Sequence, residues 1–327
     1  MPIKAAVRQV RHPGERQPGS VMNFWLLRLH RWVALVFALP LLFVLGTGLV
    51  LSIEPWLTVS AIKPGALTAA RVEAILAKHD SAGQARAISY RSYDNTLTLG
   101  AGRGGGKVID VATGEPLAGP SALAQTLGSM RGLHERLIFD LGWLVSASSA
   151  AMLILALLGV LMGWPRLRNT LSGWHKGVAW ILLPLIVLSP LTGLFLAYGV
   201  TFTSPPQGGR GQGAPMAVKD AVATIGASRD LSSLVFIRPM GGRMVARLVD
   251  DGEYALYAVT PQGLVAQQRN WPRLWHEGNF AGRWSAAMNF LLSVAMLTLL
   301  VTGVWIWARR KLCRRAPRAR TAQAPAE

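Results

Sequence analysis

The polarity pattern of the chain is dominated by four long apolar runs that carry no charged residue in their interiors. Each run is long enough to cross a hydrocarbon layer of about 30 Å at a helical rise of about 1.5 Å per residue. The first run exceeds the length of a signal-peptide core and has no small-x-small cleavage site after it, so we interpret it as an uncleaved anchor. The pattern predicts an integral membrane protein with spanning helices at 32–53, about 141–164, about 177–198 and about 286–308.

The two long connections between these runs, 54–138 and 200–283, are polar and change between helix-like and strand-like patterns. Each has about 85 residues, which is enough for a small α+β domain. Both begin with an amphipathic helix candidate, at 67–79 in the first and at 216–225 in the second. The strand candidates that follow are 87–99 and 107–117 in the first connection, and 234–238, 243–249, 253–259 and 264–268 in the second. The predicted fold class is therefore a membrane α-helical protein with two small α+β domains outside the membrane.

Two glycine-rich stretches lie within these connections. Residues 102–107 lack the full spacing of a phosphate-binding loop and do not open a helix, so we interpret them as a hairpin connection. Residues 205–215 are rich in glycine and proline, which is typical of a flexible linker.

The distribution of charge predicts the orientation of the helices. The formal net charge of +18 would suit a nucleic-acid-binding protein. However, 16 of the 34 basic residues, with only two acids, lie in the three segments on one side of the predicted membrane. By the positive-inside rule both termini are cytoplasmic and the two connections are external. The charge is thus a topology signal, and we expect no nucleic-acid partner.

The predicted layout alternates cytoplasmic segments, spanning helices and external domains. In chain order these are a basic tail (1–23), a spanning helix (24–53), an external domain (54–138), a spanning helix (139–164), a cytoplasmic loop (165–173), a spanning helix (174–199), an external domain (200–283), a spanning helix (284–308) and a second basic tail (309–327).

The spanning helices repeat along the sequence. Residues of the first span recur in the third at an offset of 145, and a proline lies mid-span in both copies. The unit of helix, external domain and helix therefore occurs twice in the same orientation, which predicts parallel repeats related by an axis along the membrane normal. The matching residues are His30 and His175, Val33-Ala34 and Val178-Ala179, Thr47-Gly48 and Thr192-Gly193, and, around the second and fourth spans, His134-Glu135 and His276-Glu277, and Gly159-Val160 and Gly303-Val304.

Four of the six histidines follow this repeat. His30 and His175 lie at the cytoplasmic ends of two helices that run the same way, so we expect them at matching depth. His134 and His276 lie at the external ends of the other two helices, also at matching depth. Interfacial polar residues, like the tryptophans near the span ends, are the simpler interpretation of any one such histidine.

Two depth-matched pairs favour a cofactor over interfacial residues. Neutral imidazole is a good ligand for haem iron, and cofactor sites in bundles are built from side chains on facing helices. The single cysteine, Cys313, excludes a CxxCH haem attachment and an iron–sulfur ligand set. We therefore predict two b-type haems per chain, one on each pair. His12 in the polar tail and His79 at the end of a soluble helix take no part.

Residues near the histidines extend this prediction. A porphyrin is wide and flat, and glycines on the facing helices leave room for it. At about 1.5 Å per residue, Gly48 lies about 27 Å beyond His30, near the level of the external pair. The predicted clearance glycines are Gly48 and Gly193 at the external level, and Gly159 and Gly303 at the cytoplasmic level. Ordinary packing of small residues between helices is the alternative explanation. The candidate partners for haem propionates are Arg31, Lys176, Arg136 and Arg273. The alternative is that the first two residues anchor the helices at the membrane surface and that the other two are plain surface charges.

Zinc or copper is the main rival cofactor. Two histidines per face are too few for a closed zinc site, which has four ligands. Glu135 and Glu277 raise the number of candidate metal ligands at the external face to four, so an external metal site stays open as an alternative. A proton relay is disfavoured, because no ionisable residue lies in the middle of a span.

With this pattern, the sequence resembles the PepSY-associated transmembrane helix family over about residues 22–312. The connections are similar to PepSY domains, with Asp110-Val-Ala-Thr113-Gly114 close to their usual turn. The resemblance implies a bacterial inner-membrane protein with periplasmic domains, and some members are b-type dihaem reductases of ferric siderophores. The residues that carry it are Leu29-His30-Arg31-Trp32, Leu39-Pro40, Thr47-Gly48, Leu133-His134-Glu135, Trp174-His175-Lys176 and Trp275-His276-Glu277.

The expected function is electron transfer across the lipid bilayer. The haem on His30 and His175 would take electrons from a quinol or a cytoplasmic reductase, and the haem on His134 and His276 would pass them to a periplasmic ferric siderophore or other iron chelate. One alternative is a haem-free PepSY protein that binds or regulates a periplasmic protease or other partner. A transporter is a further alternative, although four spans without polar residues in mid-membrane offer no evident substrate path.

Overall fold

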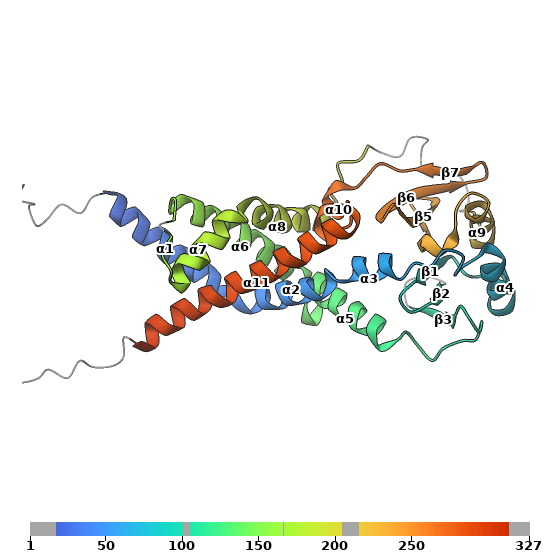
Figure 1. The fold of residues 1–327 in the computed structure, drawn as a ribbon, viewed down its shortest axis with the longest axis horizontal. Helices are drawn as coiled ribbons and strands as arrows, with labels where there is room; N and C mark the ends of the chain where they lie inside the picture. Colours follow the sequence, from blue (N-terminus) through green and yellow to red (C-terminus); the bar gives the residue numbers. More distant parts are fainter. Residues whose placement is uncertain (1–17, 101–104, 166, 205–215, 314–327) are drawn as a thin grey trace, which may run out of the picture.

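A computed structural model of the chain describes residues 18–100, 105–165, 167–204 and 216–313. A bundle of long helices carries a β-sheet at one end, and the start of the first helix and the end of the last lie at the opposite end (Figure 1). Most of both basic tails, the glycine- and proline-rich linker and part of the glycine-rich hairpin connection lie outside the described residues, so the predictions for them stay untested.

The first spanning segment is broken into successive helices. Helix α1 (Pro18–Val36) and helix α2 (Ala38–Leu51) meet at Phe37, and α3 (Glu54–Ser60) continues α2 toward the sheet. Pro40 lies in the first turn of α2, where the missing N–H costs little, whereas a proline inside one continuous helix would clash with the preceding turn. The part apolar enough to cross a membrane therefore includes α2 and α3, and it begins later than the sequence predicts.

The third spanning segment is broken in the same way. Helix α7 (Leu171–Ile181) and helix α8 (Leu183–Ala197) are bent by 66°. The break falls at Leu182, 145 residues after the break at Phe37, and Pro184 again lies in the first turn of the second piece. The two prolines that the sequence places mid-span thus mark equivalent breaks.

The second and fourth spans, α6 (Gly142–Leu161) and α11 (Gly282–Cys313), are continuous helices. Within the described residues, three helical stretches are long and apolar enough to cross a membrane, or four if α7 and α8 together form one span. Large apolar side chains such as Ile181 and Leu291 point outward from the bundle, with 78% and 65% of their surface exposed. Such a surface suits contact with lipid rather than water.

The two polar connections fold into one sheet. Its strands are antiparallel in the order β3-β2-β1-β4-β5-β6-β7, so the first strands of the two connections pair at the centre, where Ile88 lies opposite Ile237. The two α+β domains predicted from the sequence are thus two halves of one sheet. The strands are β1 (Ala87–Arg91), β2 (Thr96–Gly100), β3 (Gly106–Asp110), β4 (Leu234–Met240), β5 (Arg243–Asp250), β6 (Glu253–Thr260) and β7 (Gly263–Ala266).

A shared hydrophobic core unites the two halves. Helices α4 (Ala69–His79) and α9 (Val218–Gly226) cover the sheet on the side away from the bundle (Figure 1). Ile88 from one half and Ile237 from the other belong to the same core and are 1% and 0% exposed. Three strands from one connection would leave β1 as an unprotected edge, and pairing with β4 removes that edge from both halves.

Two short helices between the sheet and the bundle were not predicted from the sequence. Helix α5 (Ala122–Arg136) packs against α2, and helix α10 (Trp271–Glu277) packs against α8. Backbone with positive φ ends each one, at Leu137 (φ 53°) after α5 and at Gly278 (φ 69°) after α10. His134 and His276, predicted at the external ends of the second and fourth spans, thus lie on short helices of their own, and these turns separate them from α6 and α11.

Candidate functional site

His134 and His276 form a pair where α5 and α10 meet the bundle, which we call the sheet-side pair. Their ring centroids are 5.9 Å apart and the ring planes are inclined by 46°. Two imidazoles that bind one metal ion from opposite sides, with metal–nitrogen bonds of about 2 Å, have centroids about 6 Å apart. The separation of the pair would therefore allow both imidazoles to hold one metal ion, such as haem iron.

Both rings of the sheet-side pair are held through Nδ1. The Nδ1 atom of His134 lies 3.0 Å from the carbonyl oxygen of Val44. The Nδ1 atom of His276 lies 3.2 Å from the carbonyl oxygen of Ser189. Because a carbonyl oxygen can only accept, Nδ1 donates in both contacts, and Nε2 keeps the lone pair that binds metals. The two carbonyls belong to residues 145 positions apart, so the repeat supplies the same hydrogen bond to each ring.

A Thr-Gly pair on α2 forms the seat of His134. The hydroxyl of Thr47 donates to the carbonyl of Phe43 (2.6 Å), so its oxygen accepts from Nδ1 of His134 (3.2 Å). A Cβ on Gly48 would lie 3.1 Å from Cε1 of the same ring, which is tighter than ordinary contact. The hydroxyl therefore orients the imidazole and the glycine makes room for it.

His276 has the matching seat on α8. Thr192 donates to the carbonyl of Leu188 (2.8 Å) and lies 3.3 Å from Nδ1 of His276. A Cβ on Gly193 would again lie 3.1 Å from Cε1. The glycines were predicted to clear space for a porphyrin, whereas their nearest neighbours in the structure are the imidazoles themselves.

His30 on α1 and His175 on α7 form the second pair, at the end where the chain termini lie, and we call it the terminus-side pair. Their pairing stays a prediction, because the structure gives no direct contact between the two rings among the described residues. Nδ1 of His175 lies 2.9 Å from the hydroxyl of Thr302 on α11. A Cβ on Gly303 would lie 3.3 Å from Cε1 of His175, so α11 repeats the Thr-Gly seat.

His30 sits differently from the other three histidines. Its Nδ1 atom is buried and has no hydrogen-bond partner of standard geometry within the described part of the chain. Helix α1 packs against α6, where the glycine at the equivalent level is Gly159. A Cβ added to Gly159 would meet none of the described atoms within 4 Å.

The basic residues predicted to pair with propionates fall into two groups. Arg136 lies 3.8 Å from Asp140, and Arg273 lies 2.7 Å from Glu277, so both already contact carboxylates of this chain. Arg31 and Lys176 directly follow the histidines of the terminus-side pair in sequence. A propionate contact stays a prediction for all of them.

A charged network beside His276 was missed in the sequence. The guanidinium group of Arg247 on β5 lies 3.0 Å from one carboxylate oxygen of Glu277, and Arg273 binds the other. Arg238 on β4 lies diagonal to Arg247 on the same face of the sheet and stacks on Phe236, 4.2 Å from the ring centroid. Arginines at alternate positions in otherwise apolar strands are the signal that could have indicated this network.

The network carries a surplus of positive charge. Burial raises the pKa of Glu277, but the charges of Arg247 and Arg273 outweigh this effect, so its pKa lies below the ordinary value. Burial and the same two guanidinium groups lower the pKa of Arg238. Two guanidinium groups thus share the carboxylate of Glu277, and the third, on Arg238, lies near them, which favours an anionic ligand at this place.

Glu277 is one of the two carboxylates that could complete the alternative external zinc or copper site. Both carboxylate oxygens of Glu277 contact arginines, so this residue does not complete a ligand set with the histidines. Among the described residues, no group of three or more His, Cys, Asp or Glu side chains is arranged to hold a metal ion.

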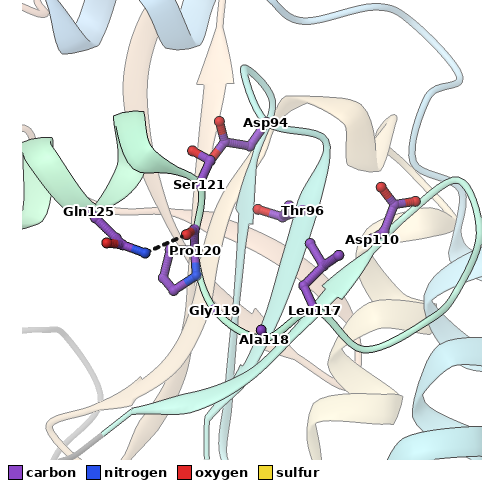
Figure 2. Close-up of a pocket in the computed structure, with 9 residues that line it drawn as sticks. All are labelled: Asp94, Thr96, Asp110, Leu117, Ala118, Gly119, Pro120, Ser121 and Gln125. Carbon is purple, nitrogen blue, oxygen red and sulfur yellow. Dashed lines mark hydrogen bonds between the residues drawn. The ribbon is translucent and has the colours of Figure 1, made fainter.

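A surface pocket of about 450 Å³ lies elsewhere, at the ends of β2 and β3 (Figure 2). Asp94 there accepts a hydrogen bond from Ser121, the N-cap of α5 (2.7 Å), so this carboxylate serves the helix start. His134 lies near the other end of α5, about 20 Å away at about 1.5 Å per residue. The pocket is therefore separate from the histidines. Its lining residues are Asp94, Thr96, Asp110, Leu117, Ala118, Gly119, Pro120, Ser121 and Gln125.

The sequence as a whole matches a known family. No curated protein is significantly similar to this chain. The model of the PepSY-associated TM region matches residues 27–310, which include all four paired histidines, both helix breaks and the whole sheet. Because this match covers most of the chain, the protein belongs to the PepSY-associated transmembrane family.

Proposed function

We propose that this protein carries electrons across a membrane through two b-type haems, one at each histidine pair, and reduces a ferric chelate on the sheet side. The observation that carries the proposal is the sheet-side pair, with rings 5.9 Å apart and each Nδ1 bound to a backbone carbonyl. Metal-ligating histidines characteristically donate their second ring N–H to a carbonyl or carboxylate. This hydrogen bond leaves Nε2 of His134 and His276 in the state that binds iron.

The residues of the chain provide ligation, spacing and exclusion of water. A bound haem would supply one-electron chemistry through its iron, without transfer of atoms. His30 and Gly48 are separated by 18 residues of α1 and α2, so the two pairs lie at opposite levels of the bundle, up to about 27 Å apart. In the bundle, apolar side chains from four helices pack into one cluster, among them Leu45, Met152, Leu185 and Met296.

The proposed location is the bacterial inner membrane, with both termini in the cytoplasm and the sheet in the periplasm. Its support is the excess of basic residues in the segments at the terminus side. In the structure, the start of α1 and the end of α11 lie at the end of the bundle away from the sheet (Figure 1). A quinol or a cytoplasmic reductase would then donate electrons at the terminus-side pair.

The acceptor would dock on the face of the sheet that carries the arginine network. Arg238, Arg247 and Arg273 offer surplus positive charge next to His276, and Phe236 adds an aromatic surface. Guanidinium groups bind oxygen anions such as carboxylates in bidentate geometry. An anionic iron(III) chelate fits this surface better than a neutral one.

Replacing Arg238 with glutamine should raise the KM for ferric citrate about tenfold, which corresponds to about 1.4 kcal/mol. The KM for a neutral hydroxamate chelate should change much less, because the lost interaction is electrostatic. Steady-state reduction of the two chelates measures this difference. Lys219→Gln, which changes an exposed charge on α9, serves as the control. Equal changes for both chelates would contradict the docking site, as would a loss of haem from the variant.

The direct test of the proposed function is the absorption spectrum of the detergent-purified protein before and after dithionite. We expect a red protein with two b haems per chain in a pyridine haemochrome assay. A colourless protein that also fails to take up added haem would remove the proposal. The four histidines would then be polar residues at the membrane interface, and a haem-free binding protein would be the remaining function.

A further inference from the structure

The seats of the four histidines are not equivalent. Three rings rest against a Thr-Gly pair, whereas leucine replaces the threonine at the fourth seat. Leu158 and Gly159 on α6 precede Thr302 and Gly303 on α11 by 144 residues, which is the offset of the second and fourth spans. His30 lies on α1, which packs against α6, and no hydroxyl of a described residue forms a hydrogen bond with its Nδ1 atom.

The threonine hydroxyl does the same thing in all three seats. Each one donates its proton to the carbonyl four residues earlier in its own helix. Its oxygen can then only accept from the imidazole, which places the ring proton on Nδ1. The donated bonds are Thr47 to Phe43 (2.6 Å), Thr192 to Leu188 (2.8 Å) and Thr302 to Thr298 (2.7 Å), and the oxygens lie 3.2, 3.3 and 2.9 Å from Nδ1 of His134, His276 and His175.

The fourth seat offers His30 only a backbone carbonyl. Leu155 lies four residues before Gly159, as Val44 lies four residues before Gly48. The carbonyl oxygen of Leu155 therefore corresponds to the backbone carbonyls that accept hydrogen bonds from the histidines of the sheet-side pair. However, no hydrogen bond of standard geometry reaches Nδ1 of His30 from any described residue. The proton position and the orientation of this ring are therefore less constrained than those of the other three.

We propose that the three threonines are positioning residues for haem-ligating imidazoles, and that Leu158 makes the terminus-side site the weaker of the two. This inference rests on the proposed function. A hydrogen bond to Nδ1–H fixes the tautomer, orients the ring and raises its basicity, and removing such a partner typically weakens metal binding about 10–100-fold. The terminus-side haem is held by one positioned ligand, His175, and one unpositioned ligand, His30.

Transfer of haem from the purified full-length protein to excess apomyoglobin tests this difference. The wild-type protein should release its two haems in two phases, the first about tenfold faster than the second. His30→Ala should abolish the haem of the fast phase. Leu158→Thr should slow the fast phase about tenfold and lower the midpoint potential of that haem alone, because a more basic imidazole stabilises iron(III).

Leu158→Val is the matched control, because valine has the shape of threonine without the hydroxyl. It should leave the fast phase unchanged or faster. Thr302→Val should accelerate the same phase, since it removes the hydroxyl from His175. Two haems that leave at equal rates, or equal effects of threonine and valine at position 158, would overturn the inference and leave the proposed function standing. A wild-type protein without haem would instead overturn both.

Discussion

Replacing His134 with alanine is expected to remove one of the two proposed haems and to leave the other in place. His134 and His276 lie on α5 and α10, far along the bundle from His30 and His175. The ligand of one pair can therefore be lost without a change in the other pair. The pyridine haemochrome assay should fall from two b haems per chain to one, and potentiometric titration should show one transition instead of two.

The matched control is His79→Ala. His79 ends α4 on the outer side of the sheet, where its Nε2 lies 2.8 Å from the carbonyl of Gly114. This variant loses a histidine of the sheet region but should keep both haems. Loss of both haems from His134→Ala, or retention of both, would show that the pairing of His134 with His276 is incorrect.

Gly48→Val is expected to expel the same haem without a change in any histidine. A Cβ alone would lie 3.1 Å from Cε1 of His134, and the two methyl groups of valine extend further. The ring has little freedom to retreat, because Val44 and Thr47 hold its Nδ1 from the same helix. We expect haem affinity at the sheet-side pair to fall at least about tenfold, in line with the loss of a ligand-orienting contact.

Gly46→Val provides the control within the same helix. A Cβ on Gly46 would meet no described atom within 4 Å, so this variant has the same helix propensity cost without the contact. Haem content and melting temperature should be measured for both variants. If both lose haem equally, the effect comes from α2 as a whole and the contact between Gly48 and the imidazole is not its cause.

The spans, the repeat and the histidines could be read from the sequence because their signals are local. Long apolar runs cannot fold in water without a partner, and basic residues gather at one side of each run. The four strands of the second connection and both helices that cover the sheet lie close to their predicted positions, since alternation and helical spacing depend only on neighbouring residues. The run 87–99, predicted as one strand, is instead the hairpin of β1 and β2, and the strand predicted at 107–117 ends at Asp110. The breaks at Phe37 and Leu182 were not predicted, but the structure places them at the same offset of 145 residues.

The composition of the site could be predicted only in part. The Thr-Gly pairs were recognised as repeated residues, but their contact with the imidazoles depends on how α5 and α10 turn back against α2 and α8. Arg238 and Arg247, next to His276, come from strands β4 and β5. In the sequence, β4 lies far from α10, and the hairpin of β6 and β7 separates β5 from α10. Their convergence on Glu277 exists only once the sheet is docked on the bundle.

By itself, the sequence determined that this chain is a membrane protein with long apolar helices, and it predicted repeated helices with four histidines at matching positions, because periodicity and charge act along the chain. Only the tertiary structure decided that the two external connections share one sheet, since the pairing of Ile88 with Ile237 joins residues 149 positions apart. Only the structure separated His30 from the other three histidines. The Nδ1 atom of His30 lacks the hydroxyl partner that threonines provide for the other three rings, and Leu158 occupies the corresponding position on α6.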